Sequence, residues 1–63
     1  MRRFAAFIAI ADAGGISAAA HTLNYAQSTV SMQLRALEAE LGVRLVHRTT
    51  GGSRLTEAGE RLL

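Results

Sequence analysis

The sequence predicts a mainly α-helical domain with a small β hairpin near its C-terminal end. Apolar residues recur at helical spacing in two segments, and glycines stand where those segments end. Short β-compatible stretches then flank Gly51-Gly52. A repeat of about 3.6 residues indicates helices, whereas short runs around glycine indicate a hairpin. With 63 residues, the chain forms one domain, and a domain of this size buries only about 60% of its unfolded surface.

A first amphipathic helix is expected from about Arg3 to Ala13, and Gly14 and Gly15 should end it. Its apolar stripe, with the spacing i, i+3, i+4 and i+7, consists of Phe4, Phe7, Ile8 and Ala11. Two arginines before an apolar run superficially resemble a secretory leader, but Asp12 interrupts the run. No segment approaches the roughly 18 apolar residues that span a membrane. We therefore expect a soluble chain.

A short second helix is expected to end at Leu23, because the run AAAHTL contains strong helix formers and Ser17 can cap it. Ala19 and Ala20 carry little bulk, which would let another helix cross closely. Residues 24–26 would then make a tight turn into the next helix. Two helices joined in this way form a helix-turn-helix.

The longest helix is expected within the segment from Asn24 to Gly42. Its buried stripe, at i, i+4, i+7 and i+11, is expected to be Val30, Leu34, Leu37 and Leu41. The opposite face carries Ser28, Ser31, Met32 and Arg35. No acidic residue occurs between Asp12 and Glu38, whereas an ordinary solvated face mixes both charges. The face is a candidate surface for a polyanion, and an ordinary solvated face is the alternative.

A hairpin is expected after the long helix, with strands in Arg44–Arg48 and Ser53–Thr56 around a polar tip. It would form a wing beside the helices. This segment holds three arginines and one histidine and no acid before Glu57, which suits contact with phosphates. Thr56 can cap a final helix that begins at Glu57, where a carboxylate favours the positive end of the helix dipole.

The chain offers little for catalysis. It has no cysteine, and its two histidines, His21 and His47, belong to separate predicted elements. Neither has the spacing of a metal site or of a base that activates a nucleophile. The glycine pairs lack the partner glycines of a nucleotide-binding loop. We expect no enzymatic activity, no metal and no cofactor.

Five motifs follow one another along the chain: AAxxL at Ala19–Leu23, QSTVS at Gln27–Ser31, LxxLExELGVRL at Leu34–Leu45, Arg48-Thr49, and RLTEAGE at Arg54–Glu60. In this order they resemble the N-terminal DNA-binding domain of LysR-type transcriptional regulators. The resemblance implies a winged helix-turn-helix in residues 1–56 and the start of a dimerisation linker helix in residues 57–63. Family members commonly have Ser and Pro where this chain has Ala26 and Ser28, so Asn24 or Ser28 would have to cap the recognition helix.

The resemblance also implies DNA contacts. Those in the major groove are Gln27, Ser28, Ser31, Met32 and Arg35, and those of the wing with the backbone and minor groove are Arg48, Thr49, Thr50 and Arg54. Gln can bond an adenine edge and Arg a guanine edge. Ser17 is either a phosphate contact or only a helix cap. Arg44 is either a DNA contact or the partner of Glu40 in an ion pair.

We therefore expect sequence-specific binding to double-stranded DNA for transcription regulation, in the cytoplasm at the nucleoid. The resemblance implies a homodimer, or a tetramer of the full-length regulator, through the linker helix that begins near Glu57. It also implies an effector-binding domain outside this chain. The alternative is a small helical protein-protein interaction module that binds a partner through the apolar stripe of residues 30–41 or through the terminal helix. An interaction module of this kind would not be expected to carry several arginines in a hairpin without acidic residues.

Overall fold

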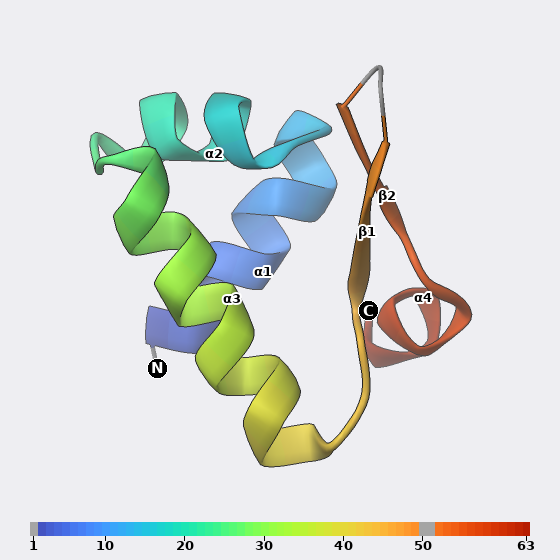
Figure 1. The fold of residues 1–63 in the computed structure, drawn as a ribbon. Coiled ribbons are helices and arrows are strands. Elements are labelled where there is room, and N and C mark those ends of the chain that lie inside the picture. The colour runs from blue at the N-terminus through green and yellow to red at the C-terminus, as the bar shows by residue number, and fades with distance from the viewer. Residues whose placement is uncertain (1, 50–51) are drawn as a thin grey trace.

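The computed structural model describes residues 2–49 and 52–63, and the side chains of residues 4–47 and 52–63. Their elements are, in order, α1 (Arg2–Ala13), α2 (Ile16–Leu23), α3 (Gln27–Leu41), β1 (Val46–Thr49), β2 (Gly52–Leu55) and α4 (Glu57–Leu62). Helices α1 to α3 gather on one side, and the hairpin with α4 stands beside them (Figure 1). The contact predicted at Thr50 and the side-chain contacts predicted at Arg48 and Thr49 lie outside the described parts.

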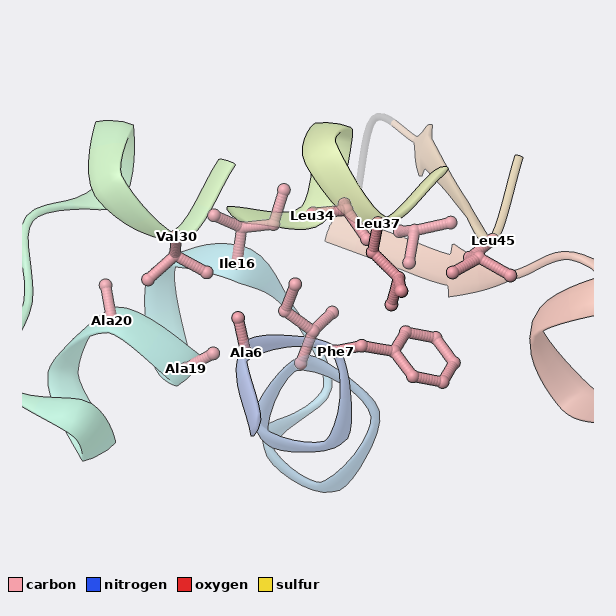
Figure 2. Packing of buried hydrophobic residues seen from close by; sticks show 11 residues of the cluster. Ala6, Phe7, Ile16, Ala19, Ala20, Val30, Leu34, Leu37 and Leu45 are labelled. Atoms are coloured by element: carbon pink, nitrogen blue, oxygen red, sulfur yellow. The ribbon is translucent and has the colours of Figure 1, made fainter. Parts of the chain in front are cut away.

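One face of each of the first three helices and the segment leading into β1 form the core. The buried residues are Ala6, Phe7, Ile10, Ile16, Ala19, Ala20, Val30, Leu34, Leu37, Leu45 and Val46. Figure 2 shows the side chains of α1 and α3 pointing toward one another, with Leu45 beside them. The small residues of α2 are buried in this contact, as predicted from Ala19 and Ala20.

Two apolar residues predicted to be buried are exposed. Ile8 is 46% exposed and Leu41 is 43% exposed, so both assignments were wrong. In α1 every residue from position 4 to 11 is apolar, so the helical period cannot tell which side faces the core, and Ala6 and Ile10 are buried instead. Leu41 is the last residue of α3, where the helix has passed the edge of the core.

The chain bends by 114° between residues 4–13 of α1 and residues 16–23 of α2. No helix among the described residues is long and apolar enough by itself to cross a membrane, and α1 with α2 meets that test only when the two are counted together across the bend.

The predicted turn between α2 and α3 is confirmed. Asn24 adopts the left-handed conformation, with φ of 60°, which Asn tolerates better than most residues. The Tyr25 N–H donates to the Ala20 carbonyl at 2.9 Å, which closes the end of α2. Asn24 therefore ends α2 and does not cap α3. The N-cap of α3 is Ala26, without a side-chain cap, so the proposed replacement caps Asn24 and Ser28 were both wrong.

The predicted cap at Ser17 was also wrong. Helix α2 begins at Ile16 with Gly15 as its N-cap, so Ser17 lies inside the first turn. The end of α3 is as predicted, because Gly42 takes a left-handed φ of 74° and its N–H donates to the Glu38 carbonyl at 2.8 Å.

The predicted hairpin is confirmed, although β1 begins at Val46, two residues later than expected, because Arg44 and Leu45 carry the chain across from α3. The strands are antiparallel, and the paired residues are Val46 with Leu55, His47 with Arg54, Arg48 with Ser53, and Thr49 with Gly52.

Thr56 fastens α4 to the segment before β1, and its predicted capping role is confirmed. Its Oγ1 accepts a bond from the Gly59 N–H at 3.0 Å and donates to the Arg44 carbonyl at 2.6 Å. Gly59 is buried, and a Cβ atom at this position would overlap the Leu45 carbonyl oxygen. The close approach of α4 to this segment therefore requires glycine at position 59.

Replacing Gly59 with Ala should lower the free energy of unfolding by about 1–3 kcal/mol, because the Leu45 backbone cannot move aside without disturbing the hairpin. Helix propensity alone would make the Ala variant more stable by about 1 kcal/mol. A loss of stability in Gly59→Ala would therefore indicate the steric contact with Leu45. Gly15→Ala, at the N-cap of α2, shows the effect of a Cβ that meets no atom within 4 Å. Urea unfolding measures each variant against the parent chain, and a midpoint for Gly59→Ala at or above that of the parent would contradict the contact.

Candidate nucleic-acid interface

The first turns of α2 and α3 meet at the surface and bring two predicted site residues together. The Gln27 side-chain Nε2 donates a hydrogen bond to Ser17 Oγ at 2.9 Å. Gln27 is the first residue of α3 and Ser17 the second of α2, and both are exposed. Nothing in the sequence links these two positions, because the bond depends on how the helices cross.

The remaining predicted residues of α3 lie along its outer side. Ser28, Met32 and Arg35 are exposed, with Met32 at 61%, and Ser31 is half-buried. Gln27, Ser31 and Arg35 are spaced by four residues, so they follow one line along the helix. The predicted face of α3 is therefore a continuous surface.

A carboxylate that the sequence analysis left without a role connects α3 to the wing. Glu38 Oε2 accepts hydrogen bonds from the Leu45 N–H at 2.8 Å and the Val46 N–H at 3.3 Å. The Glu38 side chain is only 11% exposed, and Arg44 Nε lies 3.7 Å from the same oxygen. Arg44 thus pairs with Glu38, whereas the sequence analysis had considered Glu40. The sequence did offer one signal for this contact: Glu38 stands shortly before Gly42, which ends the helix, and the apolar pair Leu45-Val46 follows.

The outer face of the hairpin carries basic side chains. His47 and Arg54 are directly opposite each other in the antiparallel register and both are exposed. Their neighbours Val46 and Leu55 pack toward the core, as the alternation of a strand requires. Arg54 therefore points away from the core.

Few acidic residues lie near the α3 face and the wing face, so both faces are basic. Between Asp12 and Glu57 the only acids are Glu38 and Glu40, and the Glu38 carboxylate is occupied by backbone N–H groups and Arg44. Asp12 lines a shallow apolar groove between α1 and α2 with Ile8 and Leu23. In the described part of the chain, no group of three or more His, Cys, Asp or Glu side chains could hold a metal ion.

The family model of the bacterial regulatory helix-turn-helix protein, lysR family, matches residues 1–60. The chain belongs to the LysR family. This result confirms the family and the winged helix-turn-helix fold inferred from the motifs.

HTH-type transcriptional regulators of known sequence resemble the chain over part of their length. YofA of Bacillus subtilis, an HTH-type transcriptional regulator, is 51% identical over 57 residues, which are 90% of this chain and 20% of YofA. TcbR of Pseudomonas sp. (strain P51) is 45% identical over 62 residues, which are 98% of this chain and 21% of TcbR. The chain thus spans about a fifth of the length of these curated relatives.

Solved structures of the LysR family share the fold. The DNA-binding domain of CbnR, crystallised as a complex with DNA, has a TM-score of 0.93 and 45% identity, over 98% of this chain and 71% of that chain. The oxidised form of Corynebacterium glutamicum OxyR has a TM-score of 0.93 and 39% identity, over 98% of this chain and 20% of that chain.

Replacing Glu38 with Ala should lower the free energy of unfolding by about 2–6 kcal/mol, because two part-buried N–H groups lose their acceptor at about 1–3 kcal/mol each. Glu57→Ala is the control: its carboxylate pairs with Arg61 at 3.2 Å but is 82% exposed, and such surface pairs contribute at most about 1 kcal/mol. Thermal unfolding of both variants makes the comparison. A loss no larger for Glu38 than for Glu57 would contradict its role in holding the wing.

Proposed function

We propose that this LysR-family domain binds double-stranded DNA sequence-specifically and acts in transcription regulation at the bacterial nucleoid, rather than as an enzyme. The observation that carries the proposal is the pairing of an exposed, acid-free face of α3 with a basic wing that the half-buried Glu38 carboxylate holds beside it. The CbnR domain of similar structure was crystallised with DNA, which supports the same use here. Of the two surfaces considered for a competing interaction module, the stripe has lost Val30, Leu34 and Leu37 to the core, which leaves only the terminal helix.

In this proposal, α3 enters the major groove with the face that begins at Gln27. Gln27 reads an adenine edge and Arg35 a guanine edge, each pair giving about 1–3 kcal/mol of discrimination. Met32 contacts a thymine methyl group, and Ser28 and Ser31 contact bases or nearby phosphates. Because Ala26 provides no side-chain cap, the first backbone N–H groups of α3 are suited to a phosphate oxygen.

The wing contacts the phosphates of the DNA backbone and extends into the neighbouring minor groove. Arg54 is exposed on its outer face beside His47. The family resemblance extends the contact to Arg48, Thr49 and Thr50 at the tip. These residues set orientation and affinity more than sequence preference.

We propose that residues 1–56 form the DNA-binding unit and that residues 57–63 begin the linker helix of a dimer. An apolar groove lies between the end of α3 and α4, and its lining includes Leu41, Val43, Leu45, Ala58 and Leu62. Leu41, Val43 and Leu62 are exposed, so a second copy could cover this groove. The full-length regulator would be a dimer or tetramer and would carry its effector-binding domain elsewhere.

The experiment that tests the proposed function is selection of bound sequences from random duplexes. Enrichment of one motif, with inverted half-sites for a dimeric form, is expected. Recovery of random sequences at every salt concentration would reject sequence-specific binding.

Arg54→Ala should weaken binding to all duplexes alike and reduce the slope of log affinity against log salt by about 0.9, because one phosphate contact is lost. Arg61→Ala is the charge-matched control, since Arg61 is 76% exposed on α4 and pairs with Glu57 there. Fluorescence anisotropy across a salt series measures both variants. An unchanged slope for Arg54→Ala, or an equal change in both variants, would remove Arg54 from the interface.

The 63-residue chain should sediment as a monomer or weak dimer, because a helix as short as α4 is marginal without its continuation. Extension through the whole helix in the full-length regulator should tighten dimerisation and raise affinity for paired half-sites by roughly 10²–10⁴ through avidity. Leu62→Glu in the extended chain should reverse the gain by placing a charge in the apolar groove. Equal dimerisation constants for all three forms would show that the dimer contact lies elsewhere.

A further inference from the structure

We propose that Ser17 is a positioning residue for base reading: its hydroxyl holds the Gln27 amide in one orientation, with Oε1 turned toward the DNA. The inference rests on the proposed function and names a determinant of its specificity. Its basis is the hydrogen bond from Gln27 Nε2 to Ser17 Oγ, 2.9 Å long, between residues ten apart in the chain. It replaces the capping alternative for Ser17, since the residue does not cap α2, and it leaves the phosphate contact open, because the hydroxyl only accepts in the bond from Gln27.

Buried neighbours fix the backbone on both sides of this bond. Ile16, next to Ser17, is buried in the core, and Val30, three residues after Gln27, is fully buried. The two helix starts therefore keep a constant separation, so the bond orders only side-chain rotations. A free Gln side chain would have to be ordered when DNA binds, at a cost of about 0.5–1.5 kcal/mol, which a bond formed beforehand reduces.

The bond also selects which groups of the amide remain for a base. A Gln amide has two N–H donors and one carbonyl acceptor. With one N–H given to Ser17, the free groups are Oε1 and the second N–H. Adenine offers a donor at N6 and an acceptor at N7, which match this pair, whereas guanine offers two acceptors at N7 and O6. A Gln27 amide fixed by Ser17 should therefore favour adenine over guanine, and a freely turning amide should discriminate less.

The serine hydroxyl keeps its own proton while it accepts from Gln27. That proton can be donated to a phosphate oxygen at the start of α2. Threonine can reproduce both bonds, and alanine can reproduce neither.

The test compares the parent chain with Ser17→Ala, Ser17→Thr and Gln27→Ala, and with Thr22→Ala as a control that removes an exposed hydroxyl elsewhere on α2. The base position read by Gln27 is the one at which Gln27→Ala loses preference in binding-site selection. Affinities for duplexes with adenine or guanine at that position are then measured by anisotropy. For Ser17→Ala the adenine-to-guanine ratio should fall roughly 2- to 12-fold, the factor that corresponds to about 0.5–1.5 kcal/mol of side-chain ordering. Ser17→Thr and Thr22→Ala should keep the parent ratio.

Two results would overturn the inference while leaving DNA binding intact. One is an equal loss of affinity on both duplexes in Ser17→Ala, which would make Ser17 a phosphate contact alone. The other is a parent preference for guanine at the Gln27 position, because bonding both guanine acceptors takes both amide N–H groups and so requires the opposite amide orientation. A parent without any sequence preference would reject the proposed function itself.

A measurement without DNA tests the bond directly. The Gln27 side-chain amide signals in a ¹⁵N NMR spectrum should shift in Ser17→Ala and should show increased side-chain mobility, while the backbone signals of α3 stay in place. Unchanged Gln27 side-chain signals would overturn the inference.

Discussion

The Glu38 carboxylate is the interaction on which the arrangement of helix and wing depends. Its Oε2 accepts from the N–H groups of Leu45 and Val46, and its own backbone carbonyl accepts from those of Gly42 and Val43. One residue thus closes the end of α3 and sets the point where the hairpin begins. A two-stranded hairpin is at best marginally stable alone, so the wing takes its position from this attachment and from the core contacts of Leu45 and Val46.

The environment of the Glu38 carboxylate explains how an acidic residue can lie next to a surface that is proposed to bind a polyanion. Charge-assisted hydrogen bonds and the nearby Arg44 guanidinium satisfy it, and its side chain is 11% exposed. Its negative charge therefore lies between α3 and the start of the wing, whereas Arg35 and Arg54 are exposed on the outer surface. Glu38 can therefore stabilise the attachment of the wing without adding negative charge to the outer surface.

Local chemistry made most of the fold predictable from the sequence, whereas contacts between elements were not. Gly42 and Asn24 mark chain reversals through their own backbone preferences, and Thr56 caps α4 through bonds within one turn. The buried side of α1 could not be predicted, because apolar residues surround most of that helix. The Ser17–Gln27 and Glu38–Leu45 bonds join separate elements, and periodicity carries no information about them. In the candidate site, the sequence thus predicted which residues lie on the outer side of α3 but not the contact between Gln27 and Ser17.

Leu45 links the proposed dimer helix to the DNA-facing elements through its backbone. Its N–H is held by Glu38 of α3, its carbonyl accepts from the Thr56 N–H at 2.9 Å, and Gly59 of α4 packs directly against that carbonyl. Along this path only the Glu38 side chain stands between α4 and the recognition helix, and two backbone N–H groups hold its carboxylate in place. If α4 carries the dimer contact, the placement of a second copy on α4 therefore fixes the separation of two recognition helices. Such a dimer can engage only half-sites whose spacing matches that separation, about one helical turn of DNA or a multiple of it.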